Sequence, residues 1–150
     1  MEVFRICEEK HSSQLSSSGA ANRWNLMGQY VIYCGTSRSL AKLELIVHRN
    51  SIVTKVNYKV LVISIIENKN SIHDLSSNDL PENWRSMSAF SSLQTLGSAW
   101  YLKQDSLVLR VPSAVIPQEN NYIINTEHPD FKSQVQLVKV EDYFWDNRLF

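Results

Sequence analysis

Hydrophobic residues along the chain form short runs between turn-forming residues, a pattern that predicts a sheet flanked by helices. The run at 58–66 is the strongest strand candidate and has too little polar alternation for a sheet exposed on one face, so it is expected to be central. Strands are predicted at 3–7, 29–34, 58–66, 107–111, 121–125 and 135–140. The aromatic tail at 141–146 is expected to pack back on the domain. The predicted class is α+β: a single domain with a mostly β core and flanking helices.

Two helices are predicted beside these strands. The first covers 39–48 and ends at His48 or Arg49, with Thr36 and Ser37 as candidate N-caps. The second follows a turn at 80–84 and runs through about Trp100, with Gly97 near its end.

Glu44 is a charged residue in a helix that is otherwise apolar nearly all round, which is the pattern of a buried helix. It shares a side with Leu40 and His48, so it either enters the core or opens into a cleft. An unpaired buried carboxylate is costly and needs a cationic partner, a raised pKa or a water-filled site. Arg23 is the candidate cation, and a buried structural ion pair with Glu44 is the alternative to a functional site.

Composition narrows the possible functions. Fifteen basic residues balance fifteen acidic ones over 150 residues, which argues against non-specific nucleic-acid binding as the main role. The start lacks the pattern of a signal peptide, and no apolar run is long enough to cross a membrane, so a cytoplasmic protein is expected. Cys7 and Cys34 are isolated and suggest neither a disulfide framework nor a zinc site.

No standard catalytic motif is present: no phosphate loop, GxGxxG, HExxH or GxSxG. His48 lies four residues after Glu44, but no third ligand follows at a suitable spacing, so no metal site is expected.

Polar residues at strand ends and in adjoining loops are the remaining candidates, because ligand sites usually form there. They are Arg23 with Trp24, Tyr33, Ser113 and Asn125. Each has a structural alternative: Tyr33 as a core aromatic, Ser113 and Asn125 as turn residues. Together with Glu44 they supply a phosphate-binding fork, an aromatic face, a carboxylate and two hydrogen-bonding groups. That combination suits a phosphate-bearing nucleoside.

Several blocks of residues follow one another along essentially the whole chain. They are Arg23-Trp24-Asn25, Gly28, Val31-Ile32-Tyr33, Leu40-Ala41-Lys42-Leu43-Glu44 with His48, Leu80-Pro81 with Trp84, Gly97-Ser98-Ala99-Trp100, Val111-Pro112-Ser113-Ala114-Val115, Asn121-Tyr122-Ile123-Ile124-Asn125 and His128-Pro129-Asp130-Phe131. In this order the blocks resemble the RES domain, so the whole of 1–150 is expected to be one such domain. One departure is Ala21-Asn22, where members often carry a glycine pair before the arginine.

The resemblance implies a toxin of a toxin–antitoxin pair, with a fold similar to ADP-ribosyltransferases and an Xre-type antitoxin as partner. It implies that NAD is a substrate, cleaved at the nicotinamide–ribose bond by water or inorganic phosphate; modification of a protein with ADP-ribose is the alternative. No cofactor is implied. A toxin homodimer within the complex is expected, without direct nucleic-acid or membrane binding.

The same resemblance places Arg23, Tyr33, Glu44 and Ser113 at active-site positions. Glu44 would stabilise positive charge on the ribose, Arg23 would hold the pyrophosphate, and Tyr33 would stack on the nicotinamide. Ser113 would orient the nicotinamide or the nucleophile. Trp24 and Asn125 are expected to contribute to substrate binding.

Overall fold

The computed structural model describes residues 1–48 and 55–149, and its centre is a seven-stranded sheet in the order β4-β5-β6-β2-β1-β3-β7. All neighbouring strands are antiparallel except β4 and β5, which are parallel. The predicted α+β class with a mostly β core is therefore confirmed. The strands are β1 (Glu2–Glu8), β2 (Val31–Gly35), β3 (Tyr58–Ile65), β4 (Ile72–Asp74), β5 (Val108–Pro112), β6 (Asn120–Asn125) and β7 (Val135–Tyr143).

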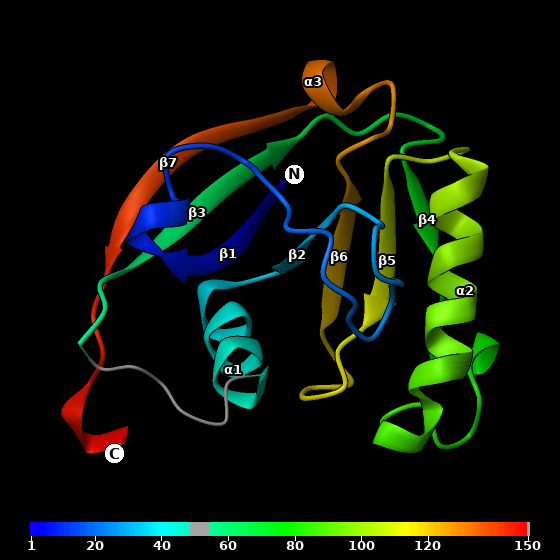
Figure 1. Cartoon of the computed structure of the whole chain (residues 1–150), viewed down its shortest axis with the longest axis horizontal. Coiled ribbons are helices and arrows are strands. Elements are labelled where there is room, and N and C mark those ends of the chain that lie inside the picture. The colour runs from blue at the N-terminus through cyan, green and yellow to red at the C-terminus, as the bar shows by residue number, and fades with distance from the viewer. Residues whose placement is uncertain (49–54, 150) are drawn as a thin grey trace.

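The sheet consists of two halves that meet at a narrow seam between β1 and β2. These strands share a single residue pair, Phe4 with Gly35, whereas β1 pairs with β3 along its whole length. In Figure 1, β1, β3 and β7 run across the left of the view, while β6, β5 and β4 stand upright on the right. The strand directions thus change at the seam, and the sheet is not closed by regular pairing there.

Helix α1 (Arg38–His48) follows β2 directly and lies beside the seam (Figure 1). Its start agrees with the prediction, because the Ser37 Oγ accepts a hydrogen bond of 3.0 Å from the Leu40 amide as an N-cap. The possible extension to Arg49 lies outside the described residues. Next to the start, Arg38 forms a bidentate pair with Glu141 of β7, at 2.8 Å for each bond. This pair ties the helix to the far half of the sheet.

Helix α2 (Phe90–Lys103) stands beside β4 and β5 (Figure 1) and differs from its prediction at both ends. A 3₁₀ turn at Met87–Ala89 precedes it, and it continues past Trp100 to a left-handed C-cap at Gln104 (φ 54°). Gly97 therefore lies inside the helix, and its role there is one of packing, as described below.

The six predicted strands are all present in the predicted order, with shifted ends, and the structure adds a seventh. Gln29 and Tyr30 precede β2, because the Gln29 side chain and the Tyr30 amide bind elsewhere: Gln29 Nε2 donates to Ser98, and the Tyr30 amide donates to the Tyr101 hydroxyl. The short β4 and the short helix α3 (Phe131–Gln134) were not predicted. Both contain too few residues to show a period.

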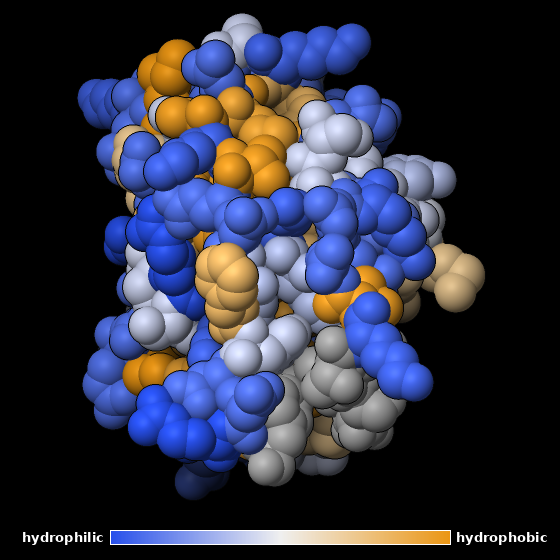
Figure 2. Space-filling view, turned by 90° about the vertical axis from the view of Figure 1, so that its left-hand side faces the viewer, coloured by the Kyte–Doolittle hydropathy of each residue, from blue (hydrophilic) through white to orange (hydrophobic). Residues whose placement is uncertain are grey.

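Strand β7 is an edge of the sheet and is longer than predicted, reaching Tyr143. The tail after it packs back as expected, with the Trp145 ring edge-on to Tyr58 at 5.5 Å between centroids. Figure 2 views this side of the molecule and shows a mostly polar surface with apolar atoms gathered in its upper part. Charged Lys139 and Glu141 on β7 discourage pairing with other edges.

Cys7 and Cys34 are both buried, and no disulfide joins them. None of the described helices is long and apolar enough to span a membrane.

Candidate active site

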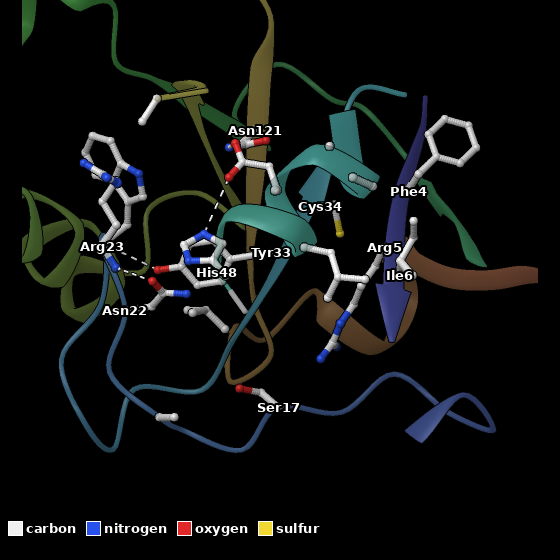
Figure 3. Close-up of a pocket in the computed structure, with 18 of the residues that line it drawn as sticks. Phe4, Arg5, Ile6, Ser17, Asn22, Arg23, Tyr33, Cys34, His48 and Asn121 are labelled. Carbon is white, nitrogen blue, oxygen red and sulfur yellow. Dashed lines mark hydrogen bonds and ion pairs between the residues drawn. The ribbon is translucent and has the colours of Figure 1, made fainter. Parts of the chain in front are cut away.

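A cleft of about 280 Å³ lies at the seam of the sheet. It is lined by β1 and β2, by α1, by the loop at 17–24, and by residues at the facing ends of β5 and β6. Figure 3 shows side chains from these separate elements pointing into one space, including Arg23, Tyr33, His48 and Asn121. The cleft is there because β1 and β2 diverge on either side of their single shared pair.

Glu44 of α1 lies in this cleft, with its side chain 19% exposed. Its Oε1 accepts two short hydrogen bonds, from Ser113 Oγ at 2.7 Å and from Asn121 Nδ2 at 2.6 Å. Its Oε2 has the His48 Nε2 at 3.5 Å. One carboxylate oxygen is thus anchored by the sheet, and Oε2 is the oxygen left for a ligand.

The pKa of Glu44 lies below its ordinary value. Burial raises this pKa, but hydrogen bonds from His48, Asn121 and Ser113 lower it by more in total. Glu44 is therefore ionised at neutral pH, in the state suited to stabilising positive charge and unsuited to donating a proton.

Ser113 is fully buried, and its hydroxyl has all its hydrogen-bonding capacity in use. It donates to Glu44 and accepts from the amides of Val115 and Ile116, each at 3.0 Å. Ser113 is thus a turn residue, which was the structural alternative to a site role. The same hydroxyl also orients the Glu44 carboxylate. Its contact in the site is with Glu44, and it is not among the residues that line the cleft.

Arg23 lines the cleft but does not form the buried ion pair considered for it. Its Nη1 donates to the backbone oxygens of Trp84 (3.0 Å) and Arg85 (3.4 Å), and the guanidinium lies 4.6 Å from the centre of the Phe90 ring. Among the described residues, the side-chain partners of Glu44 are Ser113, Asn121 and His48. Burial lowers the pKa of Arg23, and the nearby negative charge of Glu44 partly opposes this by raising it.

The anchored Nη1 fixes the orientation of the Arg23 fork, because a guanidinium is planar. Its Nε and Nη2 have no hydrogen-bond partner among the described residues and are available to an anion. The structural ion pair was the wrong alternative, because Arg23 binds backbone carbonyls through Nη1 and forms no bond with Glu44 among the described residues.

The loop that carries Arg23 is held by a network around Asn25, which is 1% exposed. The backbones of Asn22 and Asn25 bind each other, and Asn25 Nδ2 donates to the carbonyls of Ala20 (2.9 Å) and Gln29 (3.2 Å). The Tyr33 hydroxyl donates to Asn25 Oδ1 at 2.7 Å and accepts from the Trp24 amide at 3.0 Å. Burial raises the pKa of Tyr33, so the hydroxyl stays protonated in this role. Stacking of its ring on nicotinamide stays a prediction.

Helix α2 packs against the same loop and contacts it at Asn22 and Trp24. A Cβ on Gly97 would lie 1.8 Å from the Trp24 carbonyl oxygen, so only glycine allows this approach. Gln94 of the same helix donates to the Asn22 carbonyl at 3.0 Å. Trp24 lines the cleft, yet its side chain is 3% exposed and packs in a core cluster with Trp84 and Trp100. The close contact between helix and loop explains the glycine inside α2.

Asn125 is not brought to the site. It is fully buried at the far end of β6, where its amide donates to the Tyr101 carbonyl and accepts from the Glu127 amide. Asn121, near the start of β6, lines the cleft in its place and was missed as a site residue. In the structure Asn121 pairs with Gly35, at the end of β2 and just before α1, which brings its side chain to Glu44. The sequence offered one sign of this, a polar residue at the start of a predicted strand.

The charges of the cleft suit an anionic ligand. Arg5, Arg23 and His48 line it, and Glu44 is the one carboxylate among the described residues that line it. Within residues 1–48 and 55–149 there is no cluster of three or more His, Cys, Asp or Glu side chains that could hold a metal ion.

The fold and the cleft define an α+β protein with a candidate ligand site at the seam of its sheet. The site contains the Glu44 carboxylate, held through Oε1, and the Arg23 guanidinium, held through Nη1. Residues 2–146 match the RES domain family. The chain is 35% identical to Toxin Res of Photorhabdus laumondii over 99% of this chain and 97% of that protein, and 32% identical to the Prs ADP-ribosylating toxin of Sphingobium sp. over 92% and 88%. The chain therefore belongs to the RES domain family of toxins.

A solved structure shares the fold. The crystal structure of the Mycobacterium tuberculosis MbcT–MbcA toxin–antitoxin complex contains a chain that matches with a TM-score of 0.75 and 18% identity, over 95% of this chain and 83% of that one. The fold prediction is thus supported by a second molecule.

Proposed function

We propose that this protein is the toxin of a toxin–antitoxin system and that it degrades NAD by cleaving the bond between nicotinamide and ribose. The observation that carries the proposal is the Glu44 carboxylate, which is held ionised in a cleft with Arg5 and Arg23, with Oε1 bound by Ser113 and Asn121 and Oε2 facing His48 at 3.5 Å. The family membership supports a toxin.

The chemistry of the bond matches this arrangement. Nicotinamide leaves as a neutral molecule, so its departure needs no general acid, while positive charge develops on the ribose as in glycoside hydrolysis. A fixed carboxylate stabilises that charge without reorganising. Glu44 supplies this group through Oε2, and the Ser113 and Asn121 bonds to Oε1 keep it in place.

Arg23 holds the pyrophosphate in this proposal, because its free Nε and Nη2 match two phosphate oxygens. Tyr33 gives the cleft an aromatic wall for the nicotinamide ring. Water or inorganic phosphate then attacks the ribose carbon from which nicotinamide has departed. Water gives ADP-ribose and a released proton, and phosphate gives ADP-ribose phosphorylated at that carbon.

The test is NAD turnover by the purified chain, with nicotinamide, ADP-ribose and its phosphorylated form separated and quantified in buffers with and without phosphate. Glu44→Gln is the inactive comparator, and Glu127→Gln, an exposed site at the far end of β6, makes the same chemical change outside the cleft. Release of nicotinamide by the chain and by Glu127→Gln, but not by Glu44→Gln, is expected. Equal release by all three would refute the proposal.

One relative favours a second activity. The Sphingobium protein, 32% identical, is named an ADP-ribosylating toxin. Transfer of ADP-ribose to a protein uses the same bond cleavage with a side chain as acceptor. Incubation with NAD labelled in its adenine half and a cell extract separates the two activities: label on protein indicates transfer, and label in free ADP-ribose or its phosphate indicates degradation.

An antitoxin is the expected partner, since uncontrolled NAD cleavage would harm the host cell. We propose an Xre-type antitoxin that covers the cleft, with an acidic side chain or its C-terminal carboxylate on Arg23 in place of the pyrophosphate. A toxin homodimer within the complex belongs to the same proposal. Adding NAD to the purified complex tests the occlusion, because normal turnover in an intact complex would contradict it.

A further inference from the structure

The cleft contains a second arginine that the proposed reaction leaves without a role. Arg5 of β1 lines the cleft together with Arg23, and the two come from elements on different sides of the seam. Figure 3 shows Arg5 and Arg23 at opposite sides of the drawn cluster, with Tyr33 and His48 between them. Because the two arginines lie at opposite sides of the cleft, one phosphate group does not contact both.

Arg5 occupies a position on β1 that would ordinarily hold an apolar residue. In this strand Val3 and Cys7, two positions away on either side, belong to the buried core, whereas Arg5 is half-buried. Its guanidinium reaches the loop at 16–18, and Nη1 donates to the Ser16 carbonyl at 2.9 Å. Figure 3 shows the side chain extending toward the part of the loop that carries Ser17. A permanently charged group is thus placed beneath the loop that forms one wall of the cleft.

Arg5 forms no ion pair among the described residues. Its guanidinium donates one hydrogen bond there, from Nη1 to the Ser16 carbonyl. A guanidinium has several further N–H groups. These donors need acceptors, and the loop backbone supplies one of them.

Two serine hydroxyls complete this end of the cleft. Ser17 Oγ accepts a hydrogen bond from the Gly19 amide and Ser18 Oγ accepts one from the Ala20 amide, both at 3.3 Å. Each hydroxyl keeps its proton for donation, because the bond described uses only a lone pair. Both serines line the same cleft as Arg5 and directly follow Ser16, whose carbonyl Arg5 binds. A guanidinium and hydroxyl donors that line one cleft are groups that bind phosphate.

We propose that the Arg5 end of the cleft, formed by Arg5, Ser17 and Ser18, is a phosphate-binding subsite separate from the one at Arg23. The phosphate has two sources: free inorganic phosphate, or a phosphate of the dinucleotide itself. The inference rests on the proposed function only for the identity of that dinucleotide.

The experiment is a titration followed by the backbone amide signals of residues 16–20 in NMR spectra of the isotope-labelled chain. Inorganic phosphate and ADP-ribose are added separately, with sodium chloride at equal ionic strength as the control for general salt effects. Arg5→Gln removes the charge, and Arg148→Gln removes one from a side chain that is 90% exposed near the end of the chain. Unfolding temperatures establish that each variant is folded.

Saturable shifts at 16–20 are expected for the unaltered chain and for Arg148→Gln, with binding weakened at least about tenfold in Arg5→Gln. A response to inorganic phosphate identifies free phosphate as the occupant. A response to ADP-ribose alone assigns the subsite to the dinucleotide. Unchanged binding in Arg5→Gln, or shifts equal to those with chloride, would overturn the proposal.

A second variant covers the case in which Arg5→Gln fails to fold. Ser17→Ala with Ser18→Ala removes two donors and keeps the Arg5 bond to the Ser16 carbonyl, so weaker binding supports the subsite and unchanged binding refutes it. All readings are made without turnover. A chain that binds phosphate through Arg5 but leaves NAD intact would refute the proposed function and retain this subsite, and the reverse result would do the opposite.

Discussion

Ser113 and Glu44 are 69 positions apart in the chain and are joined by a hydrogen bond of 2.7 Å from the Ser113 hydroxyl to Glu44 Oε1. The hydroxyl is itself held by two amides of the turn after β5. The direction of a helix side chain is therefore set by a turn that is distant in the sequence. The predictions below test what this and related contacts contribute.

Glu44→Gln should abolish most NAD cleavage while changing the free energy of unfolding by no more than about 1 kcal/mol. The amide has the same shape, and its oxygen still accepts from Ser113 and Asn121, but it carries no charge to stabilise the ribose. Turnover and urea unfolding of the variant measure the two effects. If the variant unfolds, Glu44 has a structural role.

The lowered pKa of Glu44 predicts a pH dependence of stability. A carboxyl whose pKa is lower in the folded state stabilises the protein above its unfolded value of about 4.3. That contribution is lost as the pH falls from about 4.3 through the lower folded pKa. The difference in unfolding free energy between the unaltered chain and Glu44→Gln should therefore shrink in this window. A difference that does not change with pH would show that the pKa of Glu44 is ordinary.

Asn121→Ala should raise the pKa of Glu44, because it removes a hydrogen bond of 2.6 Å to the ionised carboxylate. The cost to folding should be small, since Asn121 Oδ1 is buried and has no hydrogen-bond partner in the part of the chain that the structure describes, and alanine removes that unsatisfied acceptor as well. The ¹³C signal of the Glu44 carboxyl, followed against pH, reports the pKa directly. An unchanged titration midpoint would remove Asn121 from the positioning of Glu44.

Gly97→Ala should destabilise the protein by about 2 kcal/mol or more and reduce activity, although the same change inside a helix usually stabilises it by about 1 kcal/mol. The new methyl group meets the Trp24 carbonyl oxygen and displaces the loop that carries Arg23. Ser92→Ala, at an exposed position of the same helix, is the control for helix propensity. Equal thermal stability of the two variants would contradict this account.

Arg23→Lys should lower NAD cleavage by at least about tenfold and leave the fold intact. An ammonium cannot bind the carbonyls of Trp84 and Arg85 and at the same time present a planar fork to a pyrophosphate. Arg148→Lys, at an exposed site, is the matched control for the substitution itself. Near-normal turnover by Arg23→Lys would show that fork geometry is not required.

The sequence was sufficient for the class, the strand order along the chain and the position of α1, because these follow from local periodicity and capping. It was also sufficient to select Glu44, since a charge on an apolar helix is a local conflict. It did not reveal that Arg23 would bind carbonyls instead of Glu44, or that Asn121 and not Asn125 reaches the cleft. Both outcomes depend on which strand ends meet at the seam, and that is a matter of long-range pairing.

The sequence placed Gly97 inside the second helix, as the structure does, but it did not show why a glycine stands there. A glycine late in an apolar run is a common sign of a helix end, and the sequence alone does not show that a distant loop approaches its Cα. The structure replaces a local explanation with a contact between Gly97 and Trp24, which are far apart in the chain.

The single pair between Phe4 and Gly35 has a mechanical consequence. With one residue pair at the seam against seven between β1 and β3, less backbone pairing opposes a change in the angle between the two halves than opposes bending within the β1–β3 half. Residues on both sides of it line the same cleft, Arg5 on one and Tyr33 on the other. A ligand that binds between them would therefore press on the weakly paired seam and not on the packed interior of either half.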